Sequence, residues 1–144
     1  MPKSLATWFT PSLQTISRSA GRSAVAAAAY RACVKLIDQT TGLIHDYTRK
    51  RGHVETLLVG ADDISELWNK AEAAETRKNS TVARELMLPL PDQWTDNERR
   101  ACVLDIAQHL RDTYGVAAAG SIHAANRHDR NGHCHLMFTT RVVD

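Results

Sequence analysis

The chain has 144 residues, of which 43% are hydrophobic and 24% charged, and this composition is that of one soluble globular domain. No apolar run of about 18 residues is present and the N-terminus lacks the apolar segment of a secretory signal, so the sequence predicts a cytoplasmic protein without membrane insertion. A net charge of +2 is only mildly basic and does not by itself indicate nucleic-acid binding. Three cysteines, none in a C-x-x-C pair, exclude a disulfide framework.

In the first half of the chain, the residue pattern predicts strands and a helix in turn. The alternation over 4–16, interrupted by Pro11, is typical of an edge strand or of two short strands. After a turn at 19–23, the alanine-rich run predicts a helix over about 21–37. Two further strands are then expected to form a hairpin through a basic loop, with the strands at 43–47 and 54–59 and the loop at 48–52.

The second half predicts two helices and three strands. A helix over 62–75 and a strand over 82–89 precede a longer helix, which begins after Thr95 in a capping box with Glu98 and ends near Gly115. Two final strands, joined by a polar loop, are expected at 116–124 and 133–142. This order predicts an α+β fold: an antiparallel sheet with helices packed mainly on one face, as in a ferredoxin-like two-layer sandwich.

Three of the seven histidines are expected on one face of two neighbouring strands. Strand alternation puts His133 and His135 on one face, about 6.6 Å apart along the strand, and Cys134 on the other. The preceding strand can present His123 on the same face, beside small residues that would form a floor beneath a ligand: Ala117, Ala119 and Ser121. Three imidazoles with open coordination positions are typical of a catalytic metal site. The other histidines are expected at the surface: His45, His53, His109 and His128.

The chain has three tyrosines, and helix position alone would make Tyr30 a packing residue. Tyr114, before the glycine that ends a helix, is also expected to pack. Tyr47 lies beside the basic loop, where it could stack on a base or act as a rival nucleophile.

Five segments together make the sequence similar to a known family. They are 17–31 (SRSAGRSAVAAAAYR), 45–51 (HDYTRKR), 74–80 (AETRKNS), 83–86 (AREL) and 131–141 (NGHCHLMFTTR). In this order, and across almost the whole chain, they resemble the MobA/MobL-type (MOBQ) conjugative plasmid relaxases of the HUH endonuclease superfamily. The resemblance implies a single relaxase (nicking) domain over 1–144, truncated at its C-terminus because such proteins usually continue further.

The resemblance also implies a reaction and the residues that perform it. Tyr30 would be the nucleophile that nicks and rejoins DNA through a 5′-phosphotyrosyl adduct, because a tyrosine ends the alanine-rich segment of the family. The metal ligands would be His123, His133 and His135, holding one divalent ion, Mn²⁺ or Mg²⁺, with Zn²⁺, Ni²⁺ or Co²⁺ as alternatives. Glu85 would belong to the active centre, either orienting a metal-bound imidazole or forming a salt bridge with Arg84 or Arg77.

The implied partners are single-stranded or locally melted origin-of-transfer DNA, relaxosome accessory proteins and a coupling protein. Clustered basic side chains are the candidates for contacts with the DNA backbone, although solvated helix surface explains such clusters equally well. The candidates are Arg18, Arg22, Arg49, Lys50, Arg51, Arg77 and Lys78.

Three other functions use part of the same pattern. A rolling-circle replication initiator or transposase has the histidine pair and a tyrosine, but the tyrosine follows the histidines, whereas Tyr30 precedes them. A non-catalytic zinc-containing DNA-binding module would need Cys134 on the histidine face. A metal-dependent hydrolytic nuclease would release a free 5′-phosphate instead of forming a protein adduct.

Overall fold

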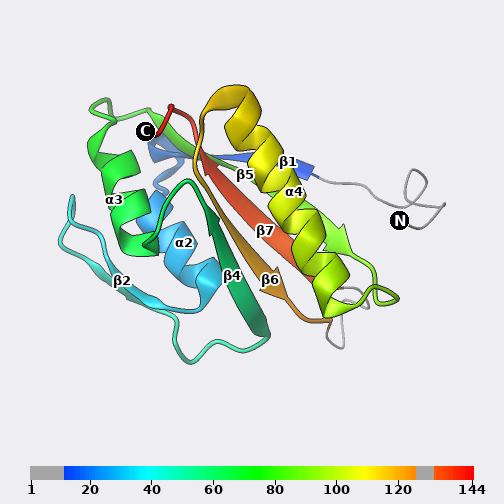
Figure 1. Ribbon diagram of the computed structural model, residues 1–144. Helices are drawn as coiled ribbons and strands as arrows, with labels where there is room; N and C mark the ends of the chain where they lie inside the picture. Colours follow the sequence, from blue (N-terminus) through cyan, green and yellow to red (C-terminus); the bar gives the residue numbers. More distant parts are fainter. Residues whose placement is uncertain (1–11, 126–131) are drawn as a thin grey trace.

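A five-stranded antiparallel sheet forms the centre of the protein (Figure 1). The computed structural model describes residues 12–125 and 132–144, so the expectations for 4–11 and for the loop 126–131, His128 included, lie outside the described residues. The strand order is β1-β5-β7-β6-β4, with bounds β1 Ser12–Ser17, β5 Thr81–Leu90, β7 Gly132–Thr139, β6 Ala118–His123 and β4 His53–Val59. As expected, the last two strands in the chain pair with each other, with His123 opposite His133.

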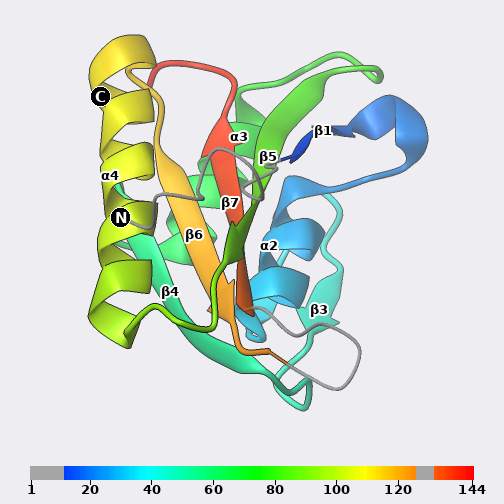
Figure 2. The same ribbon diagram turned by 90° about the vertical axis from the view of Figure 1, so that its right-hand side faces the viewer.

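The helices divide between the two faces of this sheet (Figure 2). Helices α2 (Ala24–Ala32) and α3 (Ile64–Ala73) cover one face, and α4 (Asp96–Tyr114) covers the other. The α+β class and the antiparallel sheet are confirmed, but the molecule has three layers instead of the expected two. The reason lies in the central strands, where Leu136 packs toward α4 and Met137 toward α2, so that both faces have apolar surface to bury.

Two expectations for the first half of the chain are wrong in their pairing or extent. Helix α2 ends at Ala32 because Cys33 takes the left-handed conformation, with φ 55°. The segment beyond it is strand β2 (Lys35–Ile37), which pairs with β3 (Ile44–Asp46) in a separate two-stranded sheet. The predicted hairpin of 43–47 with 54–59 therefore does not form, since β4 pairs with β6. Leu36 of β2 is buried in the core under α2 and α3, and this burial favours the pairing of β2 with β3.

The predicted ends of α4 are confirmed. Thr95 and Glu98 form the capping box, and Gly115 ends the helix with φ 71°. This helix lies close to the sheet at Gly120, where an added Cβ would be only 2.7 Å from Cγ1 of Val103. No helix in the described part of the chain is both long enough and apolar enough to span a bilayer.

Small residues line the contact between α2 and the opposite face of the sheet. Its buried alanines, among them Ala28 and Ala29, belong to one core cluster with Ala117 and Ala119 of the sheet region. Ala117 and Ala119 are therefore core residues under α2, not the floor of a ligand site. Their small size has a different consequence, because it lets the C-terminal end of α2 reach the histidines.

Candidate active site

The three histidines expected to share a metal ion lie together on the α2 face of the sheet. Their ring centroids are separated by 5.4 Å for His123–His133, 5.5 Å for His123–His135 and 5.1 Å for His133–His135. Three imidazoles that bind one ion through nitrogens about 2.1 Å away, at roughly tetrahedral angles, have ring centres about 5 Å apart. The spacing of the rings therefore fits a single divalent ion.

The ring nitrogens, however, are not all directed at a common point. Within 12–125 and 132–144, no three His, Cys, Asp or Glu side chains form a converged set of metal ligands. Nε2 of His123 lies 2.7 Å from the carbonyl oxygen of Arg31, to which it donates. To bind an ion beside the other two rings, His123 would use Nδ1 or exchange this hydrogen bond for the ion. Burial lowers the pKa of His123 to about 4, so its ring is neutral at pH 7, as a ligand must be.

Glu85 links the histidines to helix α2. Its carboxylate is 3% exposed, forms an ion pair with Nε of Arg31, and lies 3.3 Å from Nδ1 of His135. Burial acts to raise the pKa of Glu85, but the hydrogen bond from His135 and the ion pair with Arg31 outweigh it and hold the pKa below its usual value. Because the ionised carboxylate accepts the proton of Nδ1, Nε2 of His135 keeps its lone pair. Glu85 forms a salt bridge, but its partner is Arg31 and not Arg84 or Arg77, and its contact with His135 is the geometry that orienting this imidazole would need.

Tyr30 lies at the last turn of α2, next to the residue that contacts His123. Its side chain is 46% exposed, and its ring meets the edge of Tyr47 with centroids 5.1 Å apart at 83°. Nζ of Lys50 lies 3.6 Å from the centre of the Tyr30 ring and donates to the Tyr30 carbonyl oxygen at 3.1 Å. The phenol is thus held on two sides and open to solvent, as a nucleophile for a large substrate needs to be.

His53 is a fourth histidine at this site, and sequence analysis placed it at the surface. It is the register partner of His123 across β4 and β6, with ring centroids 5.8 Å apart. Its Nε2 lies 2.8 Å from Oγ1 of Thr56, which contacts Oγ of Ser121 at 3.0 Å. Burial lowers the pKa of His53. His53 directly precedes the predicted strand 54–59, which was the available signal, but the predicted hairpin paired that strand with 43–47 instead of with the strand that carries His123.

The MobA/MobL family pattern matches residues 22–144. The chain belongs to the MobA/MobL family. It is 39% identical to mobilization protein MobL of Acidithiobacillus ferridurans over 155 residues, covering 89% of this chain and 41% of that one. It is 33% identical to conjugal transfer protein TraA of Rhizobium radiobacter over 151 residues, covering 92% of this chain and 13% of TraA. The chain therefore spans less than half of either relative.

A solved structure has a similar fold. It is described as "Molecular Basis of Vancomycin Resistance Transfer in Staphylococcus aureus" and matches this MobA/MobL chain with a TM-score of 0.84 at 29% identity. The match covers 94% of this chain and 72% of that chain. The family resemblance found in the sequence is thus confirmed by the family pattern and by the relatives, and the fold is shared with this solved structure.

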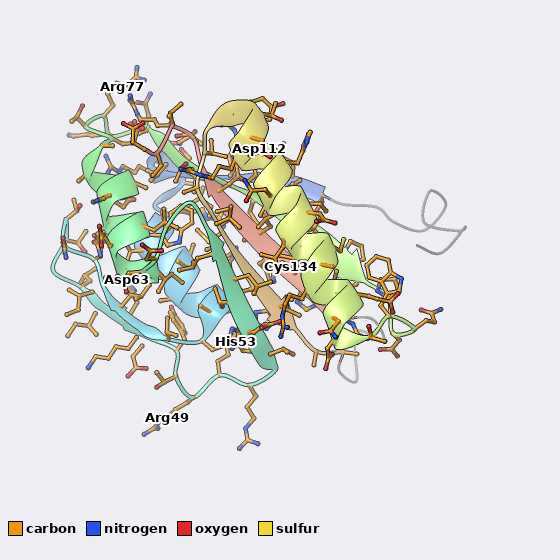
Figure 3. The ribbon with its side chains drawn as sticks, viewed as in Figure 1. Arg49, His53, Asp63, Arg77, Asp112 and Cys134 are labelled. Atoms are coloured by element: carbon orange, nitrogen blue, oxygen red, sulfur yellow. The ribbon has the colours of Figure 1, made fainter. Side chains whose placement is uncertain are left out.

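The basic residues expected to contact DNA form two groups in the MobA/MobL chain, and Arg49 and Arg77, one from each group, lie at opposite ends of the molecule (Figure 3). Arg49 and Arg51 are exposed in the loop that also carries Lys50, at the Tyr30 end. The other group consists of Arg18, Arg22, Arg77 and Lys78, which line a pocket near the start of α2. Helix α2 has nine residues and therefore separates the two groups by about 13 Å.

Arg18 differs from the other basic residues because its guanidinium is used inside the protein. It contacts the Glu72 carboxylate, with Nη2 3.1 Å from Oε1, and donates to the Glu72 and Glu75 carbonyl oxygens at 2.6 Å each. These contacts hold the C-terminal end of α3, so Arg18 is a structural residue and a poor candidate for a phosphate contact. Arg22 donates to the Thr15 carbonyl oxygen at 3.0 Å, whereas Arg77 and Lys78 are exposed.

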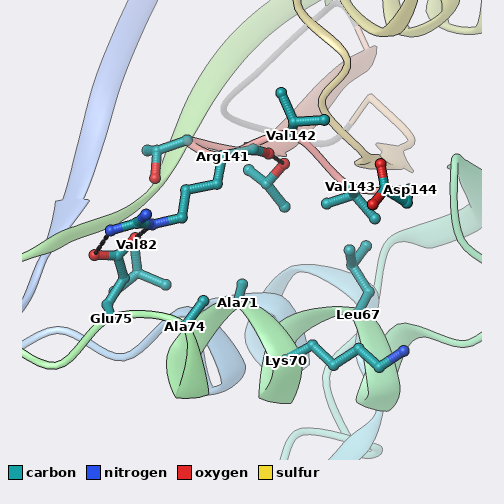
Figure 4. Close-up of a pocket in the computed structure, with 12 residues that line it drawn as sticks. Leu67, Lys70, Ala71, Ala74, Glu75, Val82, Arg141, Val142, Val143 and Asp144 are labelled. Carbon is teal, nitrogen blue, oxygen red and sulfur yellow. Dashed lines mark hydrogen bonds and ion pairs between the residues drawn. The ribbon is translucent and has the colours of Figure 1, made fainter.

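Two further features lie away from the histidine cluster. Cys134 is fully buried in the core beneath α4, where burial strongly raises the pKa of its thiol, so it points away from the histidines as strand alternation predicted. A cavity of about 320 Å³ lies between α3 and the segment 139–144 (Figure 4). It is at the opposite end of β7 from His133 and contains none of the expected site residues.

Proposed function

We propose that this chain is the nicking domain of a plasmid relaxase, which cuts and rejoins one DNA strand at an origin of transfer. The observation that carries the proposal is the cluster of three imidazoles, 5.1–5.5 Å apart, whose member His123 contacts the residue next to Tyr30. Membership of the MobA/MobL family and the names of its mobilization and conjugal transfer relatives support the same function.

The proposed reaction is a transesterification. The phenolate oxygen of Tyr30 attacks the scissile phosphorus, the bond from phosphorus to the 3′ oxygen breaks, and the leaving oxygen takes up a proton. The 5′-phosphate stays on the tyrosine as an ester, so one phosphoester bond replaces another. The reverse reaction reseals the strand without ATP because no bond energy is lost to water.

The site residues would each have a distinct task. A divalent ion held by His123, His133 and His135 would polarise a non-bridging phosphate oxygen and offset the developing charge. Glu85 fixes the tautomer of His135 by accepting from Nδ1. Tyr47 and Lys50 hold the Tyr30 ring in place while leaving its exposed edge to the DNA.

The proposed substrate is single-stranded or locally melted DNA. Tyr30 is on a helix packed against the sheet, so a phosphate must reach it without the opposite strand of a duplex in the way. Arg49 and Arg51 are exposed beside this tyrosine and would contact neighbouring phosphates. Accessory relaxosome proteins and a coupling protein are the proposed protein partners.

The alternatives lose support at particular residues. A structural zinc module would recruit Cys134, but this thiol is buried on the α4 side of the sheet. A rolling-circle initiator has its tyrosine after the histidines, whereas Tyr30 precedes them by about a hundred residues in this chain. A hydrolytic nuclease differs in its product and is distinguished by the experiment below.

The test is incubation of the protein with a 3′-labelled origin-of-transfer oligonucleotide and Mn²⁺ or Mg²⁺, followed by a denaturing gel, because the label then lies on the fragment that stays attached to the protein. We expect a DNA-linked protein band that depends on the added ion and disappears with EDTA. A free 5′-phosphate without any adduct would indicate hydrolysis and would overturn the proposal.

A further inference from the structure

Arg31 joins three parts of the site that lie far apart in the sequence. Its guanidinium contacts both oxygens of Glu85, through Nε to Oε2 and through Nη2 to Oε1 at 3.3 Å. Its main-chain carbonyl accepts the 2.7 Å hydrogen bond from Nε2 of His123. It directly follows Tyr30 in the last turn of α2. Arg31 therefore contacts His123 directly and His135 through Glu85. It is also bonded in the chain to Tyr30, the proposed nucleophile.

We propose that Arg31 is a positioning residue, which sets the orientation of His135 through Glu85 and holds the nucleophile-bearing end of α2 against the histidine cluster. The proposal rests on the proposed function. It assigns Arg31 no contact with DNA or with a metal ion. Its side chain is 13% exposed and faces the carboxylate of Glu85.

The physical argument begins with the buried carboxylate. Glu85 has a side-chain exposure of 3%, and a charge so far removed from water persists only when it is paired. A guanidinium offers a planar fork that contacts both carboxylate oxygens and so fixes the carboxylate plane. With that plane fixed, Oε1 stays directed at Nδ1 of His135. A lysine at position 31 would keep the charge but could not define the plane.

The second part of the argument concerns the position of the helix. His123 donates to the last turn of α2, and the Arg31–Glu85 pair ties the same turn to β5. Contacts with two different strands prevent this end of α2 from shifting along the sheet. Since Tyr30 is one residue away, the same contacts limit how far the phenol can move from the histidines.

The chain contains a matched control for a purely structural role. Arg18 and Glu72 form another largely buried pair, with side-chain exposures of 19% and 4% against 13% and 3% for Arg31 and Glu85. This pair lies at the opposite end of α2. Loss of either arginine–glutamate pair should lower the free energy of unfolding. Only loss of the Arg31–Glu85 pair should change the orientation and tautomer of His135.

The experiment compares Arg31→Lys with Arg18→Lys in two measurements. Calorimetry with Mn²⁺ should give more than tenfold weaker binding for Arg31→Lys, since supporting residues of this kind typically contribute about 10–100-fold to metal affinity. Arg18→Lys should bind within about twofold of the parent. Equal affinities for parent and Arg31→Lys, or equal losses for both variants, would overturn the proposal.

The second measurement needs no metal ion. Long-range ¹H–¹⁵N correlation spectra report the tautomer of each imidazole, and the parent should show His135 protonated on Nδ1. In Arg31→Lys, the two nitrogen shifts of His135 should move toward a tautomer average, while in Arg18→Lys they should not. An unchanged His135 tautomer in Arg31→Lys would refute the positioning role. If the parent neither binds Mn²⁺ nor forms a DNA adduct, the proposed function fails, and the spectra still decide whether Arg31 orients His135.

Discussion

Two phenols lie side by side at the proposed active site, so the choice of nucleophile is open to a direct test. The substitution Tyr30→Phe removes the attacking oxygen and keeps the ring. The ring would retain its edge contact with Tyr47, at 5.1 Å, and its position 3.6 Å from Nζ of Lys50. Such contacts contribute about 0.5–1.5 and 0.5–1 kcal/mol, respectively. Because both survive in phenylalanine, the free energy of unfolding should change by less than about 0.5 kcal/mol.

The effect on the reaction should be far larger. Without the phenolic oxygen no phosphotyrosyl ester can form at this position, and we expect adduct formation to fall at least about a thousandfold, which corresponds to about 4 kcal/mol in the barrier. Tyr47→Phe is the matched control because it makes the same chemical change in the neighbouring ring. It should leave the rate within a few-fold of the parent, since Tyr47 only supports Tyr30.

The assay follows the DNA-linked protein band over time for both variants, with urea unfolding curves to confirm that each is folded. Mass spectrometry of the trapped adduct from the parent then identifies the modified residue. A nucleotide on Tyr47, or adduct formation by Tyr30→Phe at the parent rate, would refute the assignment of Tyr30.

Four further predictions address the metal site, the DNA surface and the core under α4. His135→Ala should weaken Mn²⁺ binding more than tenfold in calorimetry, and an unchanged affinity would remove the proposed site. Substituting both Arg49 and Arg51 by Gln should reduce the log–log salt slope for single-stranded DNA by about 1.4, and an unchanged slope would mean that the loop does not contact phosphates. Burial lowers the pKa of His123 from 6.5 to about 4, so the stability that its neutral ring contributes should be complete above pH 6.5 and should fall by about 3 kcal/mol toward pH 4. Urea curves in EDTA should show a loss over this pH range that is about 3 kcal/mol larger for the parent than for His123→Gln. Gly120→Ala should cost about 1–3 kcal/mol in stability by crowding the core under α4, yet leave Mn²⁺ affinity unchanged.

The sequence alone predicted the features that depend on near neighbours in the chain. The capping box at Thr95 and the helix end at Gly115 involve contacts within a few residues. The common face of His133 and His135, and the opposite face of Cys134, follow from the two-residue period of a strand. The family assignment drew on several segments in a fixed order, and the comparisons confirm it.

Strand pairing between distant segments could not be predicted in the same way. The strands at Ile44–Asp46 and His53–Val59 exist, but β3 pairs with β2 and β4 pairs with β6. Their partners are decided by which apolar faces can be buried together, and a short connecting loop suggested the wrong choice. This pairing alone brings His53 beside His123.

The tertiary structure also decided the electrostatics of the site. Arg31 and Glu85 are 54 residues apart in the sequence, and within its own segment each is an ordinary charged side chain. They meet because alanines on α2 and on the sheet let the helix lie close to the histidine face. Burial then makes the ion pair necessary, since a charge that is removed from water is costly without a partner of opposite sign. No local pattern encodes this dependence, because it arises only when the two surfaces exclude water from each other.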